Sequence, residues 1–153
     1  MAGQGSGQGQ RKRRGALKGC LIALLVLVAL VAAGGAIGWS LLQKEHREAA
    51  NLPLDAVDFA KLKDDGVYHG VYDGGIYGWR ANECDVWVAD GKVTAVKLAS
   101  SKDPGNENAR PEMLYERVIA AQSLQVDTIS GATLTSKGWL QCVENALVQA
   151  QRE

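Results

Sequence analysis

A cluster of small and hydroxyl-bearing residues in the C-terminal third of the sequence has the clearest potential for chemistry. The cluster comprises Ser130, Gly131, Ala132, Thr133, Thr135 and Ser136. Small residues let a ligand or an enzyme approach the backbone closely, and the start of a helix offers N–H groups and a partial positive charge that suit a phosphate. The pattern is compatible with contact to a phosphorylated ligand. By itself it is not specific, because capping of the helix that follows is the more common role of such hydroxyls.

Two amphipathic helices are predicted on either side of this cluster. The first follows Pro111, which suits the first turn of a helix because no backbone N–H is needed there. The second is expected to start near Thr135 or Ser136, whose hydroxyls can cap the first N–H groups. Apolar residues recur at helical spacing in both segments, as Leu114, Val118 and Ala121 in the first and Trp139, Val143 and Leu147 in the second. We expect both helices to pack on one core.

Three β-strands are predicted before the helices. Residues 66–72 are rich in β-branched and aromatic residues and are closed by Asp73-Gly74-Gly75. Residues 83–89 and 92–98 flank Asp90-Gly91, a dipeptide that favours a type I′ hairpin because both of its residues must take positive φ. The expected fold class is α+β, a small antiparallel sheet with two packed helices, preceded by one transmembrane helix.

The transmembrane helix is predicted over residues 19–43, which carry no charge between Lys18 and Lys44 and exceed the ~20 residues that a bilayer core requires. The basic cluster Arg11–Arg14 precedes it, so the positive-inside rule places the N-terminus in the cytoplasm and the C-terminal part outside the cell membrane. The alternative is a cleaved signal peptide, because Gly34-Gly35-Ala36 resembles a small-residue cleavage site.

The formal net charge of zero conceals an uneven distribution. The sequence has 17 basic and 17 acidic residues, but no acidic residue precedes Glu45 and six basic residues do. Residues 1–18 are expected to form a disordered basic cytoplasmic tail. The favoured role of its basic end is to set the topology, and contact with anionic membrane lipid is the alternative. The remainder is mildly acidic, which excludes a nucleic-acid partner bound through a basic face of the folded domain.

The folded domain is expected over residues 64–153, with a linker or stalk over 44–63 because Pro53 interrupts any continuation of the membrane helix. Cys84 falls in a predicted strand and Cys142 in a predicted helix, both on the exported side, where disulfides persist. Two separate buried thiols are favoured over one disulfide, and both alternatives remain open at this point.

The string from Asp127 to Ser136 resembles the flavinylation motif of the FMN-binding domain family. This family includes the C subunit of Na⁺-translocating NADH:quinone reductases and the G subunit of RNF electron-transport complexes. The resemblance extends from Asp64 to Gln151 and includes the Gly74-Gly75 turn and the hairpin at Asp90-Gly91.

The resemblance implies that an extracytoplasmic FMN transferase joins the phosphate of FMN to Thr133 and releases AMP from FAD. Asp127 corresponds to the acidic position that the transferase reads, and Ser130, Gly131 and Ala132 correspond to the small residues that allow its approach. Thr135 and Ser136 match the hydroxyls that bond the phosphate or cap the helix. No metal site is expected.

The implied function is that of a membrane-anchored extracytoplasmic electron carrier with covalent FMN, rather than a stand-alone enzyme. A membrane reductase or quinone-linked donor would supply its electrons, and an external protein would accept them. Alternatives are a module that binds FMN or another phosphorylated ligand non-covalently, and an assembly subunit of a membrane redox complex. Aromatic residues that suit a wall for the flavin, or equally ordinary packing, are Tyr68, Tyr72, Tyr77, Trp79 and Trp87. His69 is expected at the surface rather than as a proton donor to the flavin.

Overall fold

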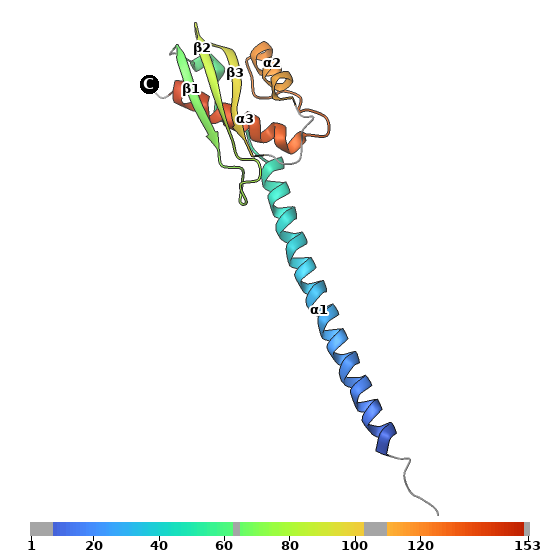
Figure 1. The fold of residues 1–153 in the computed structure, drawn as a ribbon. Coiled ribbons are helices and arrows are strands. Elements are labelled where there is room, and N and C mark those ends of the chain that lie inside the picture. Colours follow the sequence, from blue (N-terminus) through green and yellow to red (C-terminus); the bar gives the residue numbers. More distant parts are fainter. Residues whose placement is uncertain (1–7, 63–64, 103–109, 152–153) are drawn as a thin grey trace, which may run out of the picture. The chain divides into compact units, whose positions relative to one another are not determined.

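The computed structural model describes residues 8–62, 65–102 and 110–151 (Figure 1). The chain divides into two compact units, the first ending at Gln43 and the second beginning at Lys44. The predicted α+β class with a preceding apolar helix is confirmed.

The first unit consists of the long helix α1 (Gln8–Ala50) up to Gln43. From Gly19 onward α1 is long and apolar enough to cross a membrane, with a mean hydropathy of 2.8 in its most apolar window. The helix begins at Gln8, where the sequence predicted disorder up to residue 18. Extension of an existing helix by further residues costs little, and Gln, Arg and Lys are good helix formers. Residues 1–7 of the predicted tail lie outside the described residues.

The second unit begins at Lys44, so the described part of the predicted linker 44–63 belongs to the folded domain. The last turns of α1 bury Glu45 and Ala49, and the helix ends at Ala50, before Pro53. Leu54 and Leu62 then enter the core on either side of the short 3₁₀ helix η1 (Phe59–Lys61). Burial of these leucines stabilises a segment whose polar composition suggested a free stalk.

The sheet has three antiparallel strands in the order β1 (Gly66–Tyr72), β2 (Asn82–Ala89) and β3 (Lys92–Ser101). The turn between β2 and β3 has φ of 51° at Asp90 and 69° at Gly91, as a type I′ hairpin requires. The three predicted strands are therefore present, with β2 one residue longer and β3 three residues longer than predicted.

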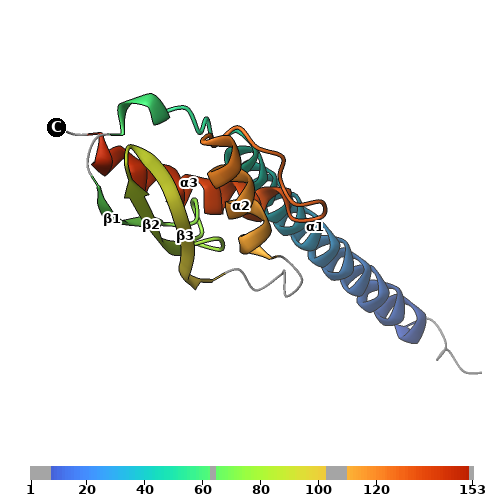
Figure 2. The same cartoon turned by 90° about the horizontal axis from the view of Figure 1, so that it is seen from above.

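Helices α2 (Pro111–Ala121) and α3 (Thr133–Ala150) pack on the sheet (Figure 2). α3 covers β1 and β2, whereas α2 lies along β3. The predicted stripe of Trp139, Val143 and Leu147 is buried, and it meets Cys84 and Val86 in one core. At Gly70 of β1 the approach is so close that an added Cβ would lie 2.1 Å from the carbonyl oxygen of Cys142.

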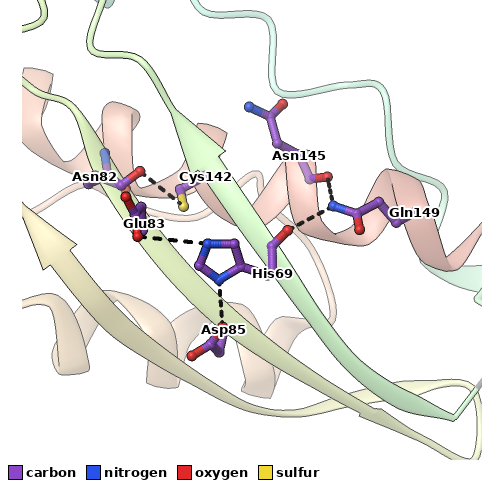
Figure 3. A network of polar contacts seen from close by, with 7 residues as sticks. All are labelled: His69, Asn82, Glu83, Asp85, Cys142, Asn145 and Gln149. Atoms are coloured by element: carbon purple, nitrogen blue, oxygen red, sulfur yellow. Dashed lines mark hydrogen bonds and ion pairs between the residues drawn. The ribbon is translucent and has the colours of Figure 1, made fainter.

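Amide side chains of the helices bond to the outer backbone groups of the edge strands. Gln149 Nε2 donates to the carbonyl of His69 at 2.8 Å (Figure 3), and Asn145 Nδ2 donates to the carbonyl of Val71 at 2.8 Å. At the other edge, Gln122 accepts from the N–H of Val93 at 2.9 Å and donates to the carbonyl of Val93 at 2.8 Å. Some outer backbone groups of both edge strands, β1 and β3, are therefore hydrogen-bonded to side chains.

Cys84 and Cys142 are free thiols in the structure, and both are fully buried. Cys142 Sγ donates to the carbonyl of Asn82 at 3.7 Å (Figure 3). The hydrogen bond with Cys142, and then burial, raise the pKa of Cys84 far above its ordinary value. Cys84 is therefore a neutral core thiol.

Candidate functional site

The segment that carries the hydroxyl cluster is the connection between α2 and α3. It starts at Gln122, which ends α2 in the left-handed region at φ 47°. Gln125 Nε2 then donates to the carbonyl of Leu54 at 2.9 Å, which ties the connection to the segment after α1. The connection is therefore held in place before it reaches the motif.

Arg117 of α2 positions the first residues of the motif. Its Nη1 donates to the backbone carbonyl of Asp127 and, at 3.3 Å, to that of Thr128. These bonds use backbone oxygens and do not involve the carboxylate of Asp127, and Asp127 is exposed. An open depression of about 510 Å³ lies beside it, lined in part by Arg117, Gln125 and Asp127.

A tight turn leads from the motif into α3. The N–H of Ala132 donates to the carbonyl of Ile129 at 2.9 Å, and Gly131 takes a φ of 79°. An added Cβ on Gly131 would meet no heavy atom within 4 Å, so the backbone conformation rather than space favours glycine there. Ser136 Oγ accepts a hydrogen bond from the N–H of Ile129 at 3.1 Å and closes the turn against the helix.

α3 begins at Thr133, two or three residues before the predicted start at Thr135 or Ser136. The prediction that Thr135 or Ser136 caps the helix at its start is wrong, because the N-cap position is Ala132 and no side chain caps the helix. Thr135 and Ser136 are buried within the first turns, whereas Thr133 is exposed. No proline follows Gly131 in this segment, so no backbone N–H is missing from the first turns of the helix. The helix can therefore start at Thr133, soon after the left-handed Gly131. The structure thus presents the Thr133 hydroxyl at the first position of an uncapped helix.

Electrostatics at this helix start favour a negatively charged group. The first turn of α3 contains no acidic residue, and the N-terminus of a helix carries a partial positive charge. Lys137 lies four residues after Thr133, on the same face of α3. Its ammonium group donates to the carbonyl of Ala50, the last residue of α1.

Tyr72 is the aromatic candidate that packs directly on α3. An added Cβ on Gly138 would lie 3.2 Å from its ring. Burial, and then the charge of Glu45, raise the pKa of Tyr72. Tyr72 and Tyr77 also line a cavity of about 400 Å³, which lies where β1 ends and β2 begins. Tyr72 therefore lies between the start region of α3 and a space large enough for a ligand.

The other aromatic candidates occupy different places. Tyr77 and Trp79 stack on each other at 5.0 Å in the β1–β2 connection, and Tyr68 packs against the core. Trp87 lies on the face of the sheet opposite Cys84 and Val86, where Lys97 Nζ is 5.5 Å from its ring centroid.

His69 also lies on this outer face. Its Nδ1 is 2.8 Å from Asp85 Oδ1 of the neighbouring strand, and its Nε2 is 3.8 Å from Glu83 Oε2 (Figure 3). Asp85 alternates with the buried residues of β2, so the imidazole is turned away from α3. His69 is a surface residue, as expected.

Residues 79–148 match the family model of the FMN-binding domain. This part of the chain is an FMN-binding domain. The match contains β2, β3, α2 and α3 as far as Val148, together with every motif residue from Asp127 to Ser136. No curated protein matches the chain. The FMN-binding domain and the apolar helix α1 together fit a membrane-anchored FMN-binding protein.

Sequence reasoning assigned no role to Arg117, which bonds to the motif backbone, to Lys137 of α3, or to Glu45, which holds the β1–β2 connection. Lys137 was visible as a cation one helical turn after Thr133. Glu45 was noted only as the first acidic residue of the chain, and it is buried. Arg117 lies in the helix predicted after Pro111. Its hydrogen bonds go to backbone carbonyls, and every residue has a backbone carbonyl, so no residue type in the sequence indicates them.

Proposed function

We propose that FMN is attached covalently to the FMN-binding domain through a phosphoester with Thr133. In this reaction, the Thr133 hydroxyl loses its proton and bonds to the FMN phosphorus of FAD. The bond from that phosphorus to the AMP portion breaks, and AMP leaves. An FMN transferase would catalyse the step. The observation that carries the proposal is the exposed Thr133 at the uncapped start of α3, inside the FMN-binding domain match.

The residues around Thr133 suit the product of this reaction. The phosphodiester would carry one negative charge beside the positive end of α3, and Lys137 supplies a cation one turn further on. The left-handed Gly131 is exposed and has no side chain, so the turn before Thr133 is open to the transferase there, whereas the small Ala132 is buried beneath the helix start. Ser130 is exposed next to them, and Asp127 presents its carboxylate at the surface.

We further propose that the protein is a single-pass electron carrier of the cell membrane with an extracytoplasmic FMN-binding domain. The basic residues before residue 19 support a cytoplasmic N-terminus. FMN itself supplies the redox chemistry when bound, whereas Thr133 keeps it from diffusing away outside the cell. A membrane reductase or quinone-linked donor would reduce the carrier, and a protein outside the membrane would oxidise it.

Intact mass spectrometry of the full chain tests the attachment. The chain is co-expressed with an FMN transferase, and an increment equal to FMN minus water is expected. Thr133→Ala should abolish the increment. Thr94→Ala removes another exposed hydroxyl, on β3, and should leave the increment unchanged. An absent increment in the wild type, or one that survives Thr133→Ala, would reject the proposal.

The non-covalent alternative makes a different prediction for the same samples. Flavin fluorescence would then be present in the native protein but absent from the band after denaturing electrophoresis. A fluorescent denatured band that disappears with Thr133→Ala supports the covalent form.

A further inference from the structure

The connection between β1 and β2 exposes a small apolar surface. Residues 74–79 carry no charge, and three of their side chains face solvent: Ile76 is 49% exposed, Tyr77 39% and Trp79 43%. The stacking of Tyr77 on Trp79 holds two of them together. Asp73 and Arg80 flank this apolar loop, so its polarity changes abruptly at both ends.

The apolar loop is fixed to the last turns of α1 by the buried carboxylate of Glu45. The N–H of Ile76 donates to Glu45 Oε2 at 3.1 Å, and Arg80 Nη1 lies 3.5 Å from Glu45 Oε1. Gly75 has a φ of 77°, and an added Cβ there would lie 2.7 Å from Glu45 Oε1. Figure 1 shows this connection beside the C-terminal end of α1. The apolar loop is therefore held beside Glu45, at the same position along the axis of α1.

The position of Glu45 along α1 sets where that level lies relative to a bilayer. Residues 19–43 are uncharged, and Glu45 follows Gln43 by two residues, which is about 3 Å along a helix axis. A helix that spans the membrane with residues 19–43 places Glu45 among the lipid headgroups. Lys44 is exposed at the same level and can meet lipid phosphates.

We propose that Ile76, Tyr77 and Trp79 enter the headgroup region of the bilayer that α1 spans and form a second membrane contact of the FMN-binding domain. This inference rests on the proposed membrane anchor. Trp and Tyr are enriched at this depth because their rings are apolar and their N–H or O–H groups stay hydrated.

The contact would also determine which end of the domain faces the membrane. Lys137 donates to the carbonyl of Ala50, and an added Cβ on Gly138 would lie 3.6 Å from Arg80 Cβ. The first turns of α3 therefore lie at the same end of the domain as the apolar loop. FMN on Thr133 would then remain close to the bilayer surface, within reach of a membrane-embedded donor.

Tryptophan quenching in lipid vesicles tests the contact. The full chain is reconstituted with Trp39→Phe, which removes the tryptophan inside the span, in phosphatidylcholine vesicles with and without a nitroxide on the headgroup. We expect quenching that is lost when Trp79→Phe is added and retained when Trp87→Phe is added instead. Trp87 is the matched control because it lies five residues along β2 from Asn82, the end of the strand next to the apolar loop.

Two further measurements separate the possible failures. Flotation of the chain with vesicles after an alkaline wash reports on α1 alone. A chain that does not float contradicts the anchor and, with it, this inference. A chain that floats but shows the same quenching with and without Trp79 overturns the lipid contact alone. Quenching of Trp79 that appears only when a membrane protein is added also overturns it.

Ile76→Ser should shift the emission of Trp79 to longer wavelength, and an unchanged spectrum would count against the proposal.

Discussion

The hydroxyl of Ser136 accepts a hydrogen bond from the N–H of Ile129 at 3.1 Å, across the turn that precedes Thr133. Ser136 is fully buried, so the bond is shielded from water. The side chain that looked like a helix cap in the sequence instead fixes the backbone on the other side of Thr133, the proposed attachment residue. The turn and the helix start consequently move as one unit.

Replacement of Ser136 by Ala should destabilise the domain by about 1–2 kcal/mol, because the N–H of Ile129 loses its acceptor. Urea unfolding measured with and without the substitution checks this value. Thr133→Ala removes an exposed hydroxyl and should change the free energy of unfolding by less than about 0.5 kcal/mol. Equal effects of the two substitutions would show that the Ser136 bond does not hold the turn.

Gly131→Ala should cost about 1–2 kcal/mol, since a Cβ is disfavoured at a φ of 79° even though space is available. Gly131→Asn should cost less, because Asn tolerates the left-handed region better. Thermal unfolding measures both variants. A fully stable Gly131→Ala variant would mean that the turn adopts another conformation in solution.

Glu45→Ala should destabilise the FMN-binding domain by about 3 kcal/mol, because it leaves the largely buried Arg80 without its partner and the N–H of Ile76 without its acceptor. Glu48→Ala, one turn later on the exposed side of α1, is the matched control and should have little effect. Denaturant unfolding of the detergent-solubilised chain gives the comparison. Equal stability of the two variants would contradict the structural role of Glu45.

Thiol titration distinguishes buried thiols from a disulfide. In a Cys20→Ser background, the folded chain should not react at pH 8, because Cys84 and Cys142 are fully buried and the pKa of Cys84 is raised. In denaturant, two thiols per chain should react. If none reacts in denaturant, Cys84 and Cys142 form a disulfide.

Tyr115→Phe should be neutral or stabilising by about 1 kcal/mol near pH 7. Its hydroxyl is buried and has no hydrogen-bond partner among the described residues. Burial raises the pKa of Tyr115 above its ordinary value of 10.0. The unfolded chain therefore releases a proton first, and the free energy of unfolding falls as the pH rises above about 10. Unfolding curves at pH 8 to 11 should show a shallower fall for Tyr115→Phe, and an identical fall would contradict this assignment.

Local patterns in the sequence were sufficient for most of the fold. The β-branched and aromatic residues at 66–72 and the Asp90-Gly91 turn predicted the sheet, and the spacing of Trp139, Val143 and Leu147 predicted the buried face of α3. These signals act between neighbours in the chain, so a sequence reveals them directly.

Contacts between distant segments were beyond the same reasoning. The pairing of Glu45 with Arg80 spans 35 residues, and the bond from Gln125 to Leu54 spans 71. The polar segment 44–63 was therefore expected to be a linker, although its residues Leu54 and Leu62 join the core. At the motif, residue types were compatible with a phosphate site, but only the folded structure shows that Thr133 is exposed and Ser136 is buried.

The amide side chains at the sheet edges have a consequence for behaviour at high concentration. A three-stranded sheet has two edges where another chain could add as a strand. Gln122 occupies both backbone groups of Val93 at one edge, and Asn145 and Gln149 occupy carbonyls of β1 at the other. Crowded copies of this domain would thus find these edge groups already occupied, which disfavours strand addition at Val93 and at the carbonyls of His69 and Val71.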